Sequence, residues 1–177
     1  EFPAIVGGHT YVSGQVDQAA HLGSPGGALY SPTGNINALS GTVEFWVRPD
    51  WNGNENRNHT FFKVGNNFNN GTLLAIDAAN NLRFIQWGDN PETPATEANV
   101  ERGIGPSGAH WLADEWHHVA ATWDGSTREY ALYIDGSLID ERYDGVRITN
   151  FSGTTLAVGV EISGATPAEA AFDEFRI

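Results

Sequence analysis

The sequence predicts an all-β protein, an antiparallel β-sandwich of two sheets. Three observations favour this fold. Short apolar or alternating segments recur along the chain, turn-forming Gly, Asn, Asp and Pro separate them, and no segment keeps a helical period over more than two turns. A length of 177 residues suits one hydrophobic core. We therefore expect residues 1–177 to form a single domain. Because the chain begins with Glu1 rather than Met, we expect it to be a segment of a larger secreted protein.

Eleven segments are predicted as strands because they are apolar or alternating and are bounded by turn-forming residues. In order along the chain, they cover residues 19–22, 27–30, 41–49, 60–64, 72–77, 82–87, 116–124, 129–134, 137–142, 154–159 and 171–177. A single helical turn at 167–172 is the only helix expected. Two connections, 50–59 and 88–110, are long for a compact domain, and loops of that length are often functional.

Alternation along the strands assigns their faces, since successive side chains of a strand point to opposite sides. In the strand at 41–49, Val43, Phe45 and Val47 form the core set, whereas Glu44 and Trp46 point to the other face. In the strand at 116–124, the core set is Val119, Ala121 and Trp123.

A tight turn is predicted at Asp135-Gly136, because Asp-Gly between two apolar segments is the strongest short signal for a β-hairpin. The hairpin would join the strands at 129–134 and 137–142.

The charge of the chain limits its partners. Its 22 Asp and Glu against 9 Lys and Arg give a net charge of −13, which disfavours nucleic acid, polyanions and anionic membranes. The acidity serves solubility, or some carboxylates bind a hard cation such as Ca²⁺. The chain has no cysteine, so it forms no disulfide and no Cys-based zinc site.

Four ordered motifs carry a family resemblance. They are Gly-Thr-Val-Glu-Phe-Trp-Val-Arg-Pro at 41–49, Trp-His-His-Val-Ala-Ala-Thr-Trp-Asp-Gly at 116–125 followed by 132–136, Leu-Ala-Val-Gly at 156–159, and Ala-Phe-Asp-Glu-Phe-Arg-Ile at 171–177. In this order they resemble the LamG-like proteins of the concanavalin A-like lectin/glucanase family, of the laminin G-like domain 3 type. The resemblance implies a jelly roll, and carbohydrate-binding or adhesive modules of secreted or surface proteins.

The resemblance also implies a structural calcium ion where the first strands meet the last. The matching side-chain ligand is Asp173, and carbonyls around Gly23 and Ser24 could complete the oxygen ligands that Ca²⁺ requires. Alternatively, Asp173 caps a strand or pairs with Arg176 or another basic side chain.

Catalytic patterns are missing from the sequence. Glycoside hydrolysis needs two carboxylates that flank the scissile bond. Glu44 has no carboxylate two residues away, and Asp173 and Glu174 point to opposite faces. His117 and His118 also face opposite ways, and we find no lyase constellation. We therefore expect that the chain is not an enzyme.

Aromatic rings and hydrogen-bonding side chains are the groups that recognise sugars. Trp51, Trp87 and Trp111 flank the long loops and are the predicted stacking platform, with Trp46 as a further candidate. The polar candidates beside them are Asn54, Arg57, His59, Gln86 and Asp89. The alternative is that Asn and Gly only shape a turn-rich loop.

These observations favour a non-catalytic, lectin-like carbohydrate-binding module, secreted or at the cell surface, whose partner is a polysaccharide or oligosaccharide. The alternatives are a protein–protein or adhesion module of a surface protein, and an atypical polysaccharide hydrolase or lyase.

Overall fold

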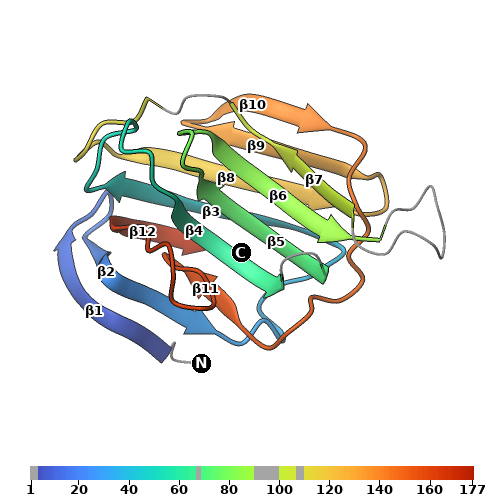
Figure 1. Cartoon of the computed structure of the whole chain (residues 1–177), viewed down its shortest axis with the longest axis horizontal. Helices are drawn as coiled ribbons and strands as arrows, with labels where there is room; N and C mark the ends of the chain where they lie inside the picture. The colour runs from blue at the N-terminus through green and yellow to red at the C-terminus, as the bar shows by residue number, and fades with distance from the viewer. Residues whose placement is uncertain (1–3, 67–68, 90–99, 107–109) are drawn as a thin grey trace.

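The computed structural model describes residues 4–66, 69–89, 100–106 and 110–177, and these residues form twelve strands and no helix (Figure 1). The predicted all-β fold is confirmed. The strands are β1 (Ala4–Ser13), β2 (Gln18–Tyr30), β3 (Ser40–Pro49), β4 (His59–Asn66), β5 (Asn69–Ile76), β6 (Leu82–Gly88), β7 (Val100–Ile104), β8 (His117–Asp124), β9 (Glu129–Ile134), β10 (Ser137–Arg142), β11 (Leu156–Val158) and β12 (Ala170–Arg176).

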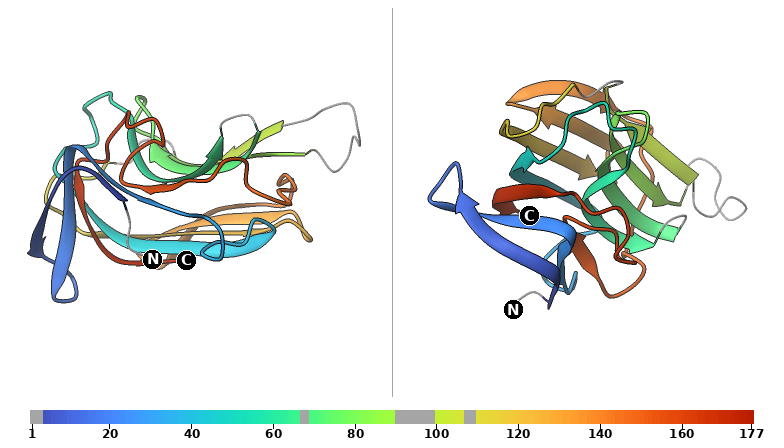
Figure 2. Two further views of the ribbon diagram at one scale, coloured as in Figure 1. Left: turned by 90° about the horizontal axis from the view of Figure 1, so that it is seen from below. Right: turned by 60° about the vertical axis from the view of Figure 1, so that its left-hand side comes forward.

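The strands form one antiparallel sheet in the order β10-β9-β8-β3-β12-β2-β11-β4-β5-β6-β7, with β1 paired to β2. This sheet folds over into the two layers of a sandwich (Figure 2). The lower layer holds β10, β9, β8, β3 and β12, and the upper layer holds β11 and β4 to β7. At the far side, β10 and β7 come into contact, so the sheet nearly closes on itself.

The long strand β2 joins the two layers. One edge of β2 pairs with β12 through residues 20–22 and with β11 through residues 28–30, while its other edge pairs with β1. Between those two parts, a Cβ on Gly27 would lie 2.2 Å from Cγ1 of Val160. Glycine is required there because the backbone of β2 passes so close to Val160 that no side chain fits between them.

The structure differs from the predicted elements at four places, three of which concern strands. The strands predicted at 19–22 and 27–30 are both parts of β2. The strands β1 and β7 were not predicted, and residues 167–169 have no regular structure in place of the expected helical turn. We attribute the omission of β7 to its place within the polar connection 88–110, where only pairing with β6 defines it as a strand.

The predicted faces of β3 and β8 are confirmed. Val43, Phe45, Val47, Val119 and Ala121 are completely buried. Phe45 lies between the layers, 6.1 Å from the ring of Phe61 and 5.5 Å from that of Phe172 between centroids. The packing of these rings from both layers forms the centre of the core.

The predicted hairpin is also present. Asp135 and Gly136 have φ angles of 50° and 76°, the pair of positive angles that a type I′ turn requires. The carboxylate of Asp135 accepts the backbone N–H of His118 at 2.8 Å, which fixes the turn against β8. Among the described residues, no helix is long and apolar enough to span a membrane.

Candidate functional site

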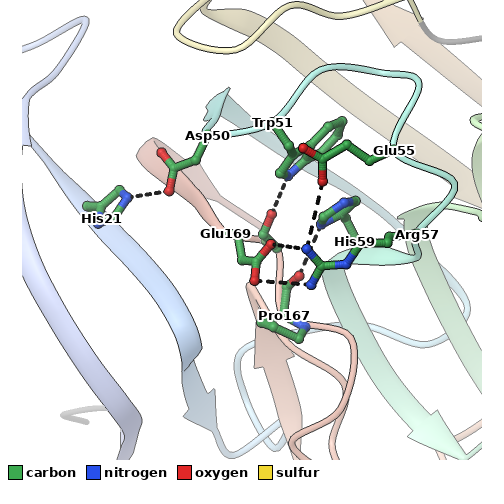
Figure 3. Close-up of polar contacts among 9 residues, drawn as sticks. His21, Asp50, Trp51, Glu55, Arg57, His59, Pro167 and Glu169 are labelled. Carbon is green, nitrogen blue, oxygen red and sulfur yellow. Dashed lines mark hydrogen bonds and ion pairs between the residues drawn. The ribbon is translucent and has the colours of Figure 1, made fainter.

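Trp51, the first predicted sugar-binding aromatic, is buried at the end of the sandwich (Figure 3). Only 3% of its surface is exposed, and its Nε1–H donates a hydrogen bond to the carbonyl of Ala168 at 2.7 Å. The His59 ring stacks on it with centroids 4.0 Å apart. Trp51 therefore anchors the loop 50–59 to the segment before β12.

The polar residues of this loop are also engaged with that segment. Arg57 forms ion pairs with Glu169 and Glu55 (Figure 3). The nitrogen–oxygen distances are 3.1 Å and 3.7 Å. His59 donates from Nδ1 to the carbonyl of Pro167 at 3.2 Å, and burial lowers the pKa of its imidazole. Asn54 is exposed on the loop. The loop thus makes structural contacts through Arg57 and His59, and presents Asn54 to solvent.

Trp111 is buried as well, with 6% of its surface exposed. Its ring stacks on Phe61 at 5.8 Å and on His117 at 4.5 Å between centroids. Trp51 also stacks on Phe61, with centroids 6.5 Å apart. The prediction of Trp51 and Trp111 as a stacking platform is wrong, because both rings are part of the hydrophobic core and no sugar can stack on them there.

Trp46 lies on the outer face of β3, as its alternation predicts, and is half-buried. Its ring is tilted against that of His118, with centroids 5.2 Å apart. Beside it, Glu44 lies 3.6 Å from His118 and 3.5 Å from Arg176. Trp46 is the one predicted aromatic that remains on the surface, but it lies on a different layer from the loops.

Trp87 lies on the outer face of β6, with 4% of its surface exposed. Its Nε1–H donates to Glu101 of β7 at 2.9 Å, and Nζ of Lys63 lies 4.6 Å from the ring centroid. Its neighbour Gln86 is buried, and Asp89 is exposed where its backbone pairs with Arg147. The prediction of Trp87 as part of a stacking platform is therefore also wrong, because its ring is buried against Lys63 and its Nε1–H is bonded to Glu101.

Lys63 is the unexpected residue of this region, because it is a lysine with only 1% of its surface exposed. Its ammonium lies 3.5 Å from Glu161, which comes from the segment between β11 and β12. Burial lowers the pKa of Lys63, whereas Glu161 acts in the opposite direction. A buried charge is stable only when other groups compensate it. Glu161 does so as the ion-pair partner, and the Trp87 ring does so through a cation–π contact.

Next to Lys63, a groove of about 250 Å³ lies on the outer face of the upper layer; we call it the outer groove. Short apolar side chains of β5 and β6 line it, namely Leu73, Ala75 and Ile85. Its polar lining consists of Asn58, Thr60, Asp77, Arg83, Glu101, Glu161 and Thr166. An apolar floor with convergent polar groups is the usual composition of a small-molecule site.

Charged side chains in the outer groove are held in fixed positions. Arg83 lies 3.7 Å from Asp77. Burial alone would raise the pKa of Asp77, but hydrogen bonds from Asn81 and Ala79, together with Arg83, hold this pKa below its ordinary value. The Asp77 carboxylate is therefore ionised at neutral pH.

The sequence missed most of this groove. A lysine inside the apolar segment Thr-Phe-Phe-Lys-Val was the one available signal, since a buried lysine is rare. Glu161 and Glu101 gave no signal, because strand pairing and the path of an irregular segment bring them to Lys63 and Trp87.

The residues predicted for calcium do not come together. Asp173 accepts the backbone N–H of Val16 at 2.8 Å and that of Glu174 at 2.9 Å. In the pairing of β12 with β2, Phe172 lies opposite Ala20. Gly23 and Ser24 therefore lie four and five residues from the partner position of Asp173, about 13 Å or more along the strand. The predicted ligand set of Asp173, Gly23 and Ser24 is wrong for this reason.

In the part of the chain that the structure describes, no three His, Asp or Glu side chains are grouped so that they could hold a metal ion.

The two layers, the central motifs and the closing strands define a LamG-like β-sandwich. The chain belongs to the concanavalin A-like lectin/glucanases superfamily, whose family model matches residues 22–177. A comparison with curated proteins gives no match.

Solved structures share the fold at low identity. Domain 4 of AbnA, a GH43 extracellular arabinanase from Geobacillus stearothermophilus in complex with arabinotriose, is 18% identical, with a TM-score of 0.66 over 97% of this chain and 75% of that one. Domains LG4-5 of the mouse laminin α1 chain are 14% identical, with a TM-score of 0.64 over 99% and 44%. The binding domain of botulinum neurotoxin serotype D is 16% identical, with a TM-score of 0.62 over 98% and 42%. The chain spans less than half the length of the latter two.

Proposed function

We propose that this chain is a non-catalytic carbohydrate-binding module of a secreted or cell-surface protein and that the outer groove holds the sugar. The observation that carries the proposal is the apolar floor of Leu73, Ala75 and Ile85 beside polar side chains of both signs. A pyranose or furanose ring has apolar C–H groups and peripheral hydroxyls, and a site of this composition matches both.

The polar groups of the groove suit hydroxyl groups. Arg83 can donate to two sugar oxygens, while the carboxylates of Asp77 and Glu161 accept hydrogen bonds from hydroxyls. Each of these groups already has a fixed partner, which orients it before the sugar arrives. Such preorganisation favours binding because little side-chain entropy is lost.

The same arrangement supports binding rather than hydrolysis. Glu161 is paired with the buried Lys63, Asp77 with Arg83, and Glu101 with the indole of Trp87. Hydrolysis needs one carboxylic acid that gives up a proton and one carboxylate that is free to act as nucleophile or base. A carboxylate held by a cation or an N–H is poorly suited to the first role.

The arabinanase domain that shares this fold was solved with arabinotriose, which makes arabinan the first polysaccharide to test. The chain would be run by affinity electrophoresis in gels that contain soluble arabinan, arabinoxylan, galactomannan or mixed-linkage glucan. We expect at least one of these neutral polysaccharides to retard it, with no release of reducing ends.

Arg83→Gln tests the site, and we expect it to weaken retardation by about tenfold, which corresponds to the loss of one charged hydrogen-bonding group. Arg142→Gln is the matched control, because Arg142 is an exposed arginine that is paired with Asp140 on β10 and does not line the outer groove. Retardation by none of the polysaccharides, or equal weakening by both variants, would contradict the proposal.

A further inference from the structure

Three adjoining cavities form a crevice on the side of the sandwich where β2 meets β11 and β12. The largest, of about 590 Å³, lies between the loops 32–38 and 149–153. A second of about 260 Å³ shares Asn35 with it, and a third of about 310 Å³ shares Tyr30 and Phe175 with the second. We call the three together the edge crevice. It shares no lining residue with the outer groove.

The largest cavity of the edge crevice is uncharged, although the chain has a net charge of −13. None of the residues that line its largest cavity is Asp, Glu, Lys, Arg or His. In the third cavity, the Asp173 carboxylate accepts two backbone N–H groups, and Glu174 is paired with Arg176. A charged ligand would therefore find no counter-charge in the largest cavity.

Hydrogen-bonding groups remain available around the largest cavity. Asn35 uses its side-chain NH₂ to donate to the carbonyl of Ser31 at 2.7 Å, and Asn37 uses its side-chain oxygen to accept the N–H of Leu39 at 2.9 Å. Asn35 therefore keeps its side-chain oxygen for a ligand, and Asn37 keeps its side-chain NH₂. Within the described ranges, the side chains of Thr149 and Asn150 bond to no other residue.

Aromatic rings lie along the whole length of the edge crevice. Phe151 lines the largest cavity, Tyr30 and Phe175 line the middle one, and Tyr11 lines the far end. Tyr11 is 64% exposed, and the ring of His9 contacts its edge at 5.7 Å between centroids. Rings at intervals, with uncharged amides and hydroxyls between them, match successive residues of a glycan chain.

We propose that the edge crevice is a second glycan-binding site, which holds several consecutive residues of a neutral polysaccharide chain. This inference rests on the proposed function only for the class of ligand, because the residues of the edge crevice and the uncharged lining of its largest cavity are independent of the outer groove. Two sites on one domain would raise the avidity for a long chain over that for a short oligosaccharide.

The test is a titration of the isotope-labelled full chain with neutral oligosaccharides, followed through backbone and side-chain amide NMR signals. The probes are a trisaccharide and an octasaccharide of arabinan and of mixed-linkage glucan. We expect the side-chain amide signals of Asn35, Asn37 and Asn150 to shift with an octasaccharide, at an affinity about tenfold above that for the trisaccharide. These shifts should not change with added salt, since the cavity that holds the three amides has no charged side chain.

Thr149→Trp should fill the largest cavity and abolish these shifts while the shifts at Arg83 and Leu73 persist. Thr42→Trp is the matched control, because Thr42 is an exposed threonine on the outer face of β3 and should leave both sets unchanged. Tyr11→Ala should weaken octasaccharide binding, and Tyr143→Ala, at a similarly exposed tyrosine, should not.

Each outcome decides between the two sites. Shifts confined to the outer groove would overturn this inference and leave the proposed function intact. Shifts at neither site with any probe would overturn both. Shifts in the edge crevice with a polyuronate but with no neutral oligosaccharide would overturn its assignment to neutral glycans.

Discussion

Lys63 places its ammonium nitrogen 4.6 Å from the centroid of the Trp87 ring, and both side chains are almost completely buried. The two lie on the outer face of the upper layer, where β-sandwich residues ordinarily face water. The segment between β11 and β12 runs beside β4, through hydrogen bonds from Gly159 to Phe61 and from Thr60 to Thr166, and brings Glu161 to Lys63. The charge on Lys63 is thereby compensated from two sides.

Glu161→Gln tests this compensation. Without the carboxylate, Lys63 remains buried as a cation, so we expect the unfolding free energy at pH 7 to fall by about 1–3 kcal/mol. Burial lowers the pKa of Lys63 in the folded chain, so the folded state binds fewer protons than the unfolded state between that pKa and about 10.4. The unfolding free energy that is lost to the buried charge should therefore be regained as the pH rises through this range.

Urea denaturation from neutral to alkaline pH measures both effects. The double variant Lys63→Met with Glu161→Gln is the control, because it removes the charge together with its partner and should recover much of the loss. If the two substitutions act additively, the ion pair contributes nothing and this interpretation is wrong.

Phe45→Ala tests the centre of the core. Phe45 is completely buried between Phe61 and Phe172, so its truncation should lower the unfolding free energy by about 3–5 kcal/mol. Thr42→Ala on the exposed face of the same strand should change it by less than about 0.5 kcal/mol. Chemical denaturation of both variants gives the comparison, and equal effects would contradict the assignment of the two faces.

The fold was largely predictable from the sequence because alternation and turn chemistry are local. The faces of β3 and β8 and the turn at Asp135-Gly136 follow from neighbouring residues alone. β7 could not be predicted, because pairing with β6 defines it as a strand, and β6 precedes it in the sequence by the whole segment 90–99.

The candidate site was much less predictable, for a related reason. A tryptophan next to a long polar loop suits both a ligand surface and the edge of a core. Trp51 belongs to the core because Ala168, more than a hundred residues away, accepts its N–H, and this is a contact that no local pattern encodes. The groove beside Lys63 likewise depends on Glu161 and Glu101, which come from distant segments.

Trp51→Ala should therefore act on stability. Loss of a buried ring that stacks on His59 and bonds to Ala168 should cost about 3–5 kcal/mol. Trp51→Phe keeps an aromatic ring but leaves the carbonyl of Ala168 unpaired, so we expect a smaller loss of about 1–3 kcal/mol. Thermal unfolding ranks the variants, with Tyr143→Ala as an exposed control; an unchanged midpoint for Trp51→Ala would show that the ring is not part of the core.

His59 makes the stability depend on pH. Burial lowers the pKa of His59 in the folded chain, whereas the unfolded chain takes up this proton at about pH 6.5, the ordinary pKa of histidine. The unfolded state then binds more protons than the folded state, so stability should fall as the pH drops below that value towards the folded pKa. Thermal midpoints between neutral and mildly acidic pH should show this fall, and His59→Gln should reduce it. His110→Gln, at an exposed histidine, should not, and the same slope in all three proteins would exclude His59 as the cause.

Asp173→Asn separates a structural carboxylate from a calcium ligand. Asp173 accepts one backbone N–H with each oxygen, from Val16 and from Glu174, and asparagine can accept only one of them in the same geometry. We expect a loss of about 1–3 kcal/mol, equal in calcium and in EDTA. The thermal midpoint of the unsubstituted chain should likewise be the same in both buffers, because Gly23 and Ser24 lie too far along β2 to join a shell around Asp173. A midpoint that rises with calcium in the unsubstituted chain and not in Asp173→Asn would mean that other oxygens complete a site there, and would reverse this conclusion.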